Sequence, residues 1–227
     1  MIKKILSLLI ITSFIFTFSA CDSTNTSSAV KPTTTLKTTT TKGQTTNNTK
    51  TQQAIDGKTS CGEDYLDINK NWKVTFSTNL GDFVVTLDPK NSPIGSAHLA
   101  SLVNSGFYNN LTFHRIVKGF VIQGGDPQGN GSGSSDCSVI SEAPTKAYVK
   151  GDFAWAKTGD APNGSAGSQF FIVTDDSAAQ SLTNQYGTAG SVTSGMDIVT
   201  KIENVKLGQA ETPAEKVTIT KATLSES

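Results

Sequence analysis

The chain has 227 residues, with 19 basic and 19 acidic side chains and therefore no net formal charge. This balance excludes a globally basic nucleic-acid-binding protein and a strongly acidic tail protein. Three cysteines are too few for a disulfide scaffold, and the two histidines, His98 and His114, exclude a multi-histidine metal site.

The N-terminus has the pattern of a secretion signal. Lys3 and Lys4 precede an apolar run over residues 5–18, and small residues follow directly before Cys21. This pattern predicts a signal peptide over residues 1–20. The ending Ser-Ala-Cys also resembles a bacterial lipobox, which implies cleavage before Cys21 and a lipid on its thiol. Ordinary signal cleavage and an uncleaved anchor remain open alternatives, although the apolar run is short for spanning a membrane.

Residues 21–60 differ sharply in composition from the rest of the chain. Serine and threonine dominate, and apolar residues are almost absent. Such a segment cannot bury enough apolar surface to offset its ordering entropy, so we predict a disordered tether behind a lipidated Cys21. One globular domain is predicted over residues 61–227. The expected location is extracytoplasmic, at a bacterial cell membrane that holds the lipid anchor.

The globular part begins with a predicted hairpin and a helix. Residues 72–89 contain two stretches of alternating apolar residues around a polar turn, which indicates a β-hairpin. The next segment changes to helical spacing: Ser92 is a candidate N-cap, Pro93 suits the first turn, and Gly106 ends the pattern. We expect His98, on this helix, to be exposed or half-buried.

The remaining elements are mostly strands. A second short helix is predicted over Ser194–Asn204, where apolar residues share one face. Strand-like runs cover Leu111–Val117, Phe120–Gln123, Asp152–Ala156, Gln169–Thr174 and Lys216–Ala222. Many short strands with only two helices predict a mainly β fold, in which a closed barrel has helices over its ends.

Two segments have unusual compositions. "FHRIVKGFVIQGGDP", residues 113–127, places one arginine among apolar residues. If its two strands are neighbours, Arg115, Phe120 and Gln123 meet at one end of a sheet face. "GDFAWAKTGDAPNGSAGSQFFIVT", residues 151–174, contains a long loop of small residues before a strand. No lysine follows its glycines as in a P-loop, so it is not a phosphate-binding loop.

These two segments resemble motifs of the cyclophilin family of peptidyl-prolyl cis-trans isomerases. The flanking "GFYNNLTFHR" and "GMDIVTKIE" are also similar to that family, and the resemblance runs from about Trp72 to Ala222. It implies a closed eight-stranded antiparallel β-barrel capped by two α-helices. It also implies an isomerase that acts on proline-containing polypeptides.

The resemblance assigns roles to individual positions. Arg115 corresponds to the main catalytic group, and Gln123 would orient it and the substrate carbonyl. The implied substrate-binding residues are Phe120, Val121, Ala156, Lys157, Gln169, Phe171, Leu182 and Tyr186. Ser181 replaces a tryptophan that helps many eukaryotic members to bind cyclosporin, so weak inhibition by that drug is predicted. A structural arginine stacked on Phe120 is the alternative interpretation of Arg115.

Proline isomerisation suits such a residue set. The peptide bond resists rotation by about 18–20 kcal/mol, and no bond to carbon, oxygen or hydrogen breaks when it rotates. The reaction therefore requires an apolar slot and a fixed donor, and we expect neither a metal ion nor a cofactor. Of the two strand residues Phe170 and Phe171, one is expected in the core and only the other in the slot wall.

Two further expectations concern the cysteines and the partners. Outside the cytoplasm Cys61 and Cys137 can pair, and two free or separately buried thiols are the alternative. The expected partners are proline-containing chains and, through the Cys21 lipid, a membrane; we expect no nucleic acid and a monomer. The predicted function is to assist folding of secreted or surface proteins. A proline-peptide-binding or holdase module with little turnover, and a structural surface protein, are the alternatives.

Overall fold

A computed structural model of the protein describes residues 59–182 and 184–227. The predicted signal peptide, Cys21 with its lipid, and the tether as far as residue 58 lie outside the described residues. Within the part that is described, no helix is both long enough and apolar enough to cross a membrane.

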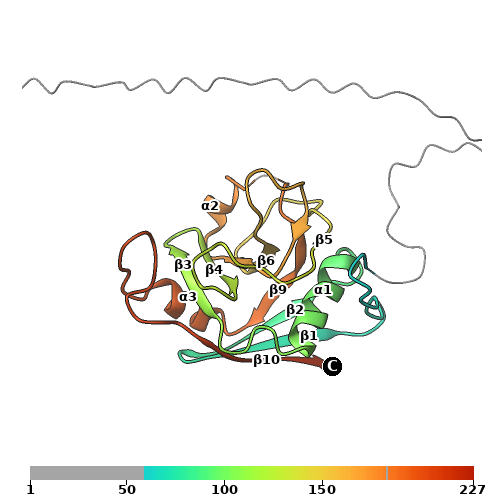
Figure 1. Ribbon diagram of the computed structural model, residues 1–227, viewed down its shortest axis with the longest axis horizontal. Coiled ribbons are helices and arrows are strands. Elements are labelled where there is room, and N and C mark those ends of the chain that lie inside the picture. The colour runs from blue at the N-terminus through green and yellow to red at the C-terminus, as the bar shows by residue number, and fades with distance from the viewer. Residues whose placement is uncertain (1–58, 183) are drawn as a thin grey trace, which may run out of the picture. The chain divides into compact units, whose positions relative to one another are not determined.

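The described residues form ten strands and three helices (Figure 1). In chain order they are β1 (Trp72–Thr78), β2 (Gly81–Leu87), α1 (Pro93–Asn104), β3 (Thr112–Val117), β4 (Val121–Asp126), β5 (Val139–Ile140), β6 (Asp152–Trp155), β7 (Ser165–Ala166), β8 (Phe170–Val173), α2 (Asp176–Ala179), β9 (Thr188–Ser194), α3 (Met196–Glu203) and β10 (Ile219–Glu226).

Eight of these strands make one antiparallel sheet in the order β10-β1-β2-β9-β6-β8-β4-β3, while β5 and β7 pair separately. The predicted hairpin is confirmed, because β1 pairs with β2 in a register that sets Phe76 opposite Phe83. Strand β9 was not predicted, because its "TAGSVTS" has almost no large apolar residue to mark a strand.

The prediction of a closed barrel is wrong, because the sheet is an open half-barrel. Near its edge strands β3 and β10, the described residues form one isolated bridge, between Thr112 and Thr218, and backbone hydrogen bonds join residues 110–113 to residues 217–219. Beside β3 runs instead the irregular segment between α3 and β10, whose Glu211 carbonyl accepts a hydrogen bond from the Ile116 N–H at 2.8 Å. Left-handed backbone at Ala210 and Glu211, followed by Pro213, prevents this segment from continuing as a strand.

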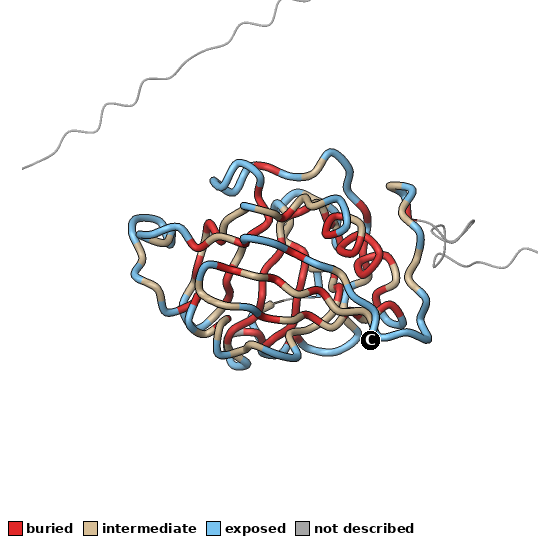
Figure 2. Tube along the Cα trace, turned by 90° about the horizontal axis from the view of Figure 1, so that it is seen from below, coloured by how far each residue is buried: buried red, intermediate tan, exposed pale blue. Residues whose placement is uncertain are grey.

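Alternating residues of β4, β6 and β8 build two separate apolar clusters. One face contributes Ile122, Phe153 and Phe170 to the main core, which also receives side chains from β1, β2 and α1. The other face builds a smaller group, here called the outer cluster. Its buried members are Val121, Tyr148, Ala154, Phe171, Val173 and Ala179, and its partly buried members are Val117, Phe120, Ala156, Leu182 and Tyr186. Buried residues concentrate in the strands and α1, and the connecting loops are largely exposed (Figure 2).

Helix α1 has the predicted start and end but a different cap. Pro93 occupies the first turn, yet the Ser92 side chain makes no capping bond and contacts the Thr188 hydroxyl. The Glu142 carboxylate instead accepts the N–H groups of Ile94 and Gly95. A distant acid therefore satisfies the free donors at the helix N-terminus, where a negative charge is also favourable.

Candidate active site

Arg115 and Gln123 occupy adjacent strands and lie opposite each other in the β3–β4 register. The Arg115 Nη1 donates to Gln123 Oε1 at 3.4 Å, and Gln123 Nε2 donates to Gln169 Oε1 at 3.0 Å. The expectation that Arg115 and Gln123 meet is confirmed by this geometry, whereas Phe120, the third side chain expected there, lies in the outer cluster. Each amide has its orientation set by the next, so the chain of donors fixes the direction of the guanidinium.

Gln169 is itself anchored by the loop that follows β4. Its Nε2 donates to the carbonyls of Gly131 and Gly133, at 2.9 and 2.8 Å. Asp126 organises this loop by accepting backbone N–H groups, including those of Gln128 and Gly131. Burial acts to raise the pKa of Asp126, but these hydrogen bonds outweigh it and hold the pKa below its usual value. The ionised carboxylate is therefore part of the support for Gln169.

Gly125 allows β4 to approach the start of β8. Its φ is +81°, and a Cβ at this position would lie 2.3 Å from the Ser168 carbonyl oxygen. Only glycine fits such an approach in the left-handed region. The Gly-Gly of the sequence motif thus sets the spacing that brings Gln169 within reach of Gln123.

Six of the predicted substrate-binding residues gather in the outer cluster beside Arg115 and Gln123. Val121 and Phe171 are nearly fully buried and form its floor, and Phe120, Leu182 and Tyr186 are half-buried at its rim. The rings of Phe171 and Tyr186 meet edge to face, with centroids 5.3 Å apart. Phe170 faces the main core instead, so the expected division between the two phenylalanines is confirmed.

A cavity of about 600 Å³ adjoins this cluster. Gln123, Gln169, Ala156 and Lys157 line it, together with the glycines and hydroxyl side chains of the surrounding loops. Lys157 is the only charged residue in this lining, and its Nζ donates to the Ala161 carbonyl at 3.1 Å. The two remaining predicted binding residues, Lys157 and Gln169, therefore border the cavity rather than the apolar floor.

Two site features had no signal in the sequence. The Tyr148 hydroxyl donates to the Tyr186 carbonyl at 2.7 Å and so fixes the rim residue, while burial raises the Tyr148 pKa to about 12. Glu211 accepts a hydrogen bond from Arg115 Nε at 2.8 Å. Both partners are remote in the chain, and neither Tyr148 nor Glu211 stands in a recognisable motif.

His114, the neighbour of Arg115 on β3, packs inside the domain. It is buried, and neither ring nitrogen has a hydrogen-bond partner within the described residues. Burial lowers its pKa, Asp126 acts in the opposite direction, and Arg115 lowers it further. Burial and the adjacent Arg115 charge therefore both disfavour the charged imidazolium form of His114.

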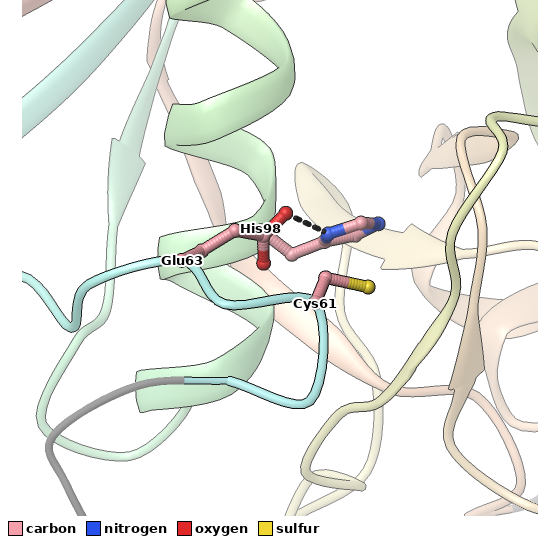
Figure 3. A group of neighbouring side chains, drawn as sticks. All are labelled: Cys61, Glu63 and His98. Atoms are coloured by element: carbon pink, nitrogen blue, oxygen red, sulfur yellow. Dashed lines mark hydrogen bonds and ion pairs between the residues drawn. The ribbon is translucent and has the colours of Figure 1, made fainter.

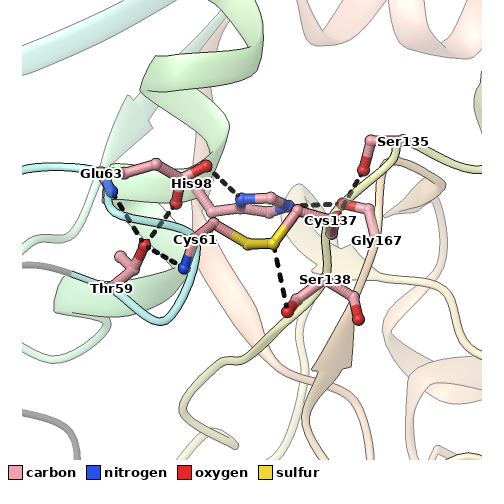
Figure 4. Close-up of a disulfide and its surroundings, with 8 residues drawn as sticks. All are labelled: Thr59, Cys61, Glu63, His98, Ser135, Cys137, Ser138 and Gly167. Atoms are coloured by element: carbon pink, nitrogen blue, oxygen red, sulfur yellow. Dashed lines mark hydrogen bonds and ion pairs between the residues drawn. A yellow bond between two sulfur atoms is a disulfide. The ribbon is translucent and has the colours of Figure 1, made fainter.

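The structure joins Cys61 to Cys137, with Cα atoms 6.0 Å apart (Figure 4). The expectation that His98 is exposed or half-buried is wrong: its side chain is 1% exposed and bonds Glu63 through Nδ1 and the Gly167 carbonyl through Nε2. Cys61, Glu63 and His98 bring ligand-type atoms within 4.8 Å of one another (Figure 3). Because the Cys61 sulfur is bonded to Cys137, this group acts as a structural fastening in the oxidised chain.

Comparisons with known proteins agree with this geometry. The family model described as cyclophilin type peptidyl-prolyl cis-trans isomerase matches residues 73–224. Peptidyl-prolyl cis-trans isomerase-like 1 of Emericella nidulans is 34% identical over 160 residues, which cover 67% of this chain and 94% of the relative. Peptidyl-prolyl cis-trans isomerase-like 3 of Dictyostelium discoideum is 32% identical over 156 residues, which cover 66% and 94%.

Solved structures give the same answer. A Cryptosporidium parvum cyclophilin type peptidyl-prolyl cis-trans isomerase superposes with a TM-score of 0.59 at 28% identity, covering 68% of this chain and 98% of that one. The same protein in the presence of the dipeptide Ala-Pro gives a TM-score of 0.58. The chain therefore belongs to the cyclophilin family and is an enzyme of the peptidyl-prolyl cis-trans isomerase class.

Proposed function

We propose that Arg115 is the catalytic donor with which this isomerase accelerates rotation of X-Pro bonds in flexible segments of secreted or surface proteins. Gln123 and Gln169 hold the guanidinium, and the outer cluster receives the proline ring. The observation that carries this proposal is the donor chain from Arg115 through Gln123 to Gln169 at the edge of an apolar floor.

The chemistry of a twisted amide explains why one arginine is sufficient. X-Pro isomers have similar free energies but exchange over tens to hundreds of seconds, because resonance resists rotation. In the twisted state the proline nitrogen regains its lone pair and the carbonyl loses its amide character. A guanidinium keeps its charge and presents several donors in one plane, so it stabilises that state without transferring a proton.

Two further observations support the choice of substrate. Phe171 and Tyr186 offer ring faces and edges to a ligand, and half-buried Phe120 and Leu182 leave apolar surface at the rim. The related Cryptosporidium protein was crystallised in the presence of Ala-Pro. A pyrrolidine ring on the apolar floor would set its preceding carbonyl near the arginine.

The test compares wild type with Arg115→Ala and Arg115→Lys in an exchange assay on an X-Pro peptide. A hydrogen bond to a charged group contributes about 1.5–3 kcal/mol, which predicts an approximately 10- to 150-fold lower kcat/KM for Arg115→Ala. Arg115→Lys keeps the charge but loses the planar fork, so we expect it to recover only part of the activity. Full activity of Arg115→Ala, with an unchanged unfolding midpoint, would refute the role of Arg115.

We also propose that the enzyme is extracytoplasmic and tethered to a membrane through a lipid on Cys21. The signal pattern over residues 1–20 and the serine/threonine-rich segment after it support this location. The Cys61–Cys137 disulfide also suits an oxidising compartment. The relatives named above are eukaryotic and give no support to the bacterial lipoprotein form.

Mass spectrometry of the native N-terminus tests this location. We expect a mature chain that begins at Cys21 and has the added mass of a lipid, and detergent-phase partitioning that Cys21→Ser abolishes. A mature chain that partitions into water and begins at an unmodified residue would contradict the anchor while leaving the isomerase activity unaffected.

A further inference from the structure

The catalytic arginine has an acidic partner that the family motifs do not include. Arg115 Nε donates to Glu211 Oε2 at 2.8 Å, across 96 positions of sequence. The two side chains are 41% and 45% exposed. Exposed ion pairs contribute little to stability, because water screens them and their side chains lose entropy. Stability therefore does not account for this contact.

The backbone that presents Glu211 is strained. Ala210 and Glu211 have φ values of +52° and +62°, in the left-handed region that side chains with a Cβ disfavour. Within residues 59–182 and 184–227, the only other non-glycine residue of this kind is Asn110, a residue type that tolerates the conformation. Two consecutive strained residues persist only where surrounding contacts hold them, and such positions cluster at functional sites.

Tertiary contacts hold this segment against β3. The Glu211 carbonyl accepts the Ile116 N–H at 2.8 Å, one residue after Arg115. The Gly208 N–H donates to the Thr212 carbonyl at 2.7 Å and closes the loop around the strained pair. The Glu211 carbonyl and carboxylate therefore accept hydrogen bonds from two neighbouring residues of β3, Ile116 and Arg115. These bonds fix the carboxylate relative to Arg115.

The contacts also define the plane of the guanidinium. Nε is held by Glu211 and Nη1 by Gln123, and within the described residues Nη2 has no hydrogen-bond partner. Because the group is planar and rigid, fixing two nitrogens fixes the direction of the third. The carboxylate bonds Nε, the nitrogen nearest the aliphatic part of the side chain, so it orients the guanidinium without occupying Nη2.

We propose that Glu211 is a positioning residue, which locks the guanidinium of Arg115 through Nε and leaves Nη2 free for the substrate carbonyl. The left-handed pair at residues 210 and 211 exists to deliver that carboxylate. This inference rests on the proposed role of Arg115 as the catalytic donor. The experiments below therefore distinguish failure of the positioning role of Glu211 from failure of the catalytic role of Arg115.

The first experiment measures kcat and KM for Glu211→Ala and Glu211→Gln, with Glu215→Gln as the matched control in the same loop. Glu215 is exposed and has no contact with Arg115. We expect Glu211→Ala to lower kcat/KM about two- to fivefold, equivalent to about 0.4–1 kcal/mol. The loss should fall mainly on kcat, because orientation matters most in the twisted state. Glu211→Gln should lose less, and Glu215→Gln should match wild type.

The second experiment is a double-mutant cycle with Arg115→Ala. If Glu211 acts only through Arg115, Glu211→Ala should have no further effect on kcat/KM in the Arg115→Ala background. The Arg115 Nε–H signal in NMR spectra should also exchange faster with water in Glu211→Ala than in wild type. A role confined to folding would shift the unfolding midpoint and would leave the cycle additive.

The outcomes separate the two proposals. Loss of activity in Arg115→Ala, with full activity in folded Glu211→Ala, would overturn the positioning role alone. A rise in activity in Glu211→Ala would also overturn it, because the carboxylate would then compete with the substrate. Full activity in Arg115→Ala would refute the catalytic role itself. Should Glu211→Ala fold poorly, the isosteric Glu211→Gln and the Nε–H exchange rate decide the question.

Discussion

Strands β4, β6 and β8 bury apolar side chains on both faces, yet only one face is open to a ligand. On the inner face, Phe170 stacks on Phe153 with ring centroids 4.7 Å apart and is completely buried in the main core. On the outer face, its neighbour Phe171 meets Tyr186 at a half-exposed rim. The inner face is filled by elements from the whole domain, and the outer face is covered by loops, by Val117 of β3 and by Ala179 of the short helix α2. The apolar residues of the two faces alternate along the same strands and differ only in which side they face.

Substitution of the two neighbouring phenylalanines gives the sharpest contrast between these faces. Phe170→Ala should lower the free energy of unfolding by about 3–5 kcal/mol, because it loses transfer free energy and leaves a cavity. Phe171→Ala should cost about 1.5–3 kcal/mol, since water can enter from the open side. Urea denaturation measures both effects.

For catalytic activity we expect the reverse order, with the larger loss in Phe171→Ala and the smaller loss in Phe170→Ala. At low temperature, where both variants are folded, Phe171→Ala should lower kcat/KM about tenfold or more through lost contact with the proline ring. Phe170→Ala should keep most of the activity per folded molecule. Equal losses of activity and stability at both positions would contradict the division into core and floor.

The disulfide tests whether the loop after β4 needs a covalent link to the N-terminal segment, whose Cys61 packs against the main core. Cys61 and Cys137 are 76 positions apart, and their bond ties the N-terminal segment to the loop that ends at the cavity-lining residue Ser138. Replacing both with serine should lower the free energy of unfolding by about 2–4 kcal/mol. Wild type treated with a dithiol reductant is the control, and its free energy of unfolding should fall by a similar amount. An unchanged free energy of unfolding in both cases would mean that the disulfide does not contribute to stability.

Acid should weaken the hydrogen bonds by which Asp126 holds the loop after β4. Asp126 has a lowered folded pKa, so its contribution is complete above the usual value of 3.8 and is lost as pH falls through the folded value. At pH 7, Asp126→Asn should lower the free energy of unfolding by about 1 kcal/mol, the difference between charged and neutral hydrogen bonds.

The difference between Asp126→Asn and wild type should shrink at pH values below 3.8, where the wild-type carboxyl also becomes protonated. Denaturation curves at pH 7 and at low pH measure it, with the exposed Asp82→Asn as a control for charge. A difference that stays constant across this range would exclude an ionised Asp126 as the support of the loop.

Much of the site followed from local patterns. Alternation along one strand separated Phe170 from Phe171. Alternation also placed Arg115 and Gln123 together on the condition that their strands are neighbours, which the structure fulfils. Such patterns are reliable because side-chain direction in a strand has a period of two, independent of the rest of the chain. The same reasoning missed β9, since small residues give no alternation to detect.

The errors concern the path of segments in space. Closure of the barrel was predicted, but the segment around Glu211 runs beside β3 as strained loop. His98 was expected to be exposed or half-buried, but it is fully buried and bonded to Glu63 of the N-terminal segment. Ser92 was expected to cap α1, but Glu142 does so from 47 or 48 positions away. Each error arises where a residue distant in the chain supplies the decisive contact.

The sequence by itself determined the strands of the motif region and the division of their side chains between two faces, because these depend on alternation along a short stretch, and its motifs carried the resemblance to the family. Only the tertiary structure decided that Glu211 forms an ion pair with Arg115, that Cys61 forms a disulfide with Cys137 and that the sheet does not close into a barrel. These contacts depend on how irregular loops return to the sheet, and loop paths are set by the sum of many weak, long-range interactions.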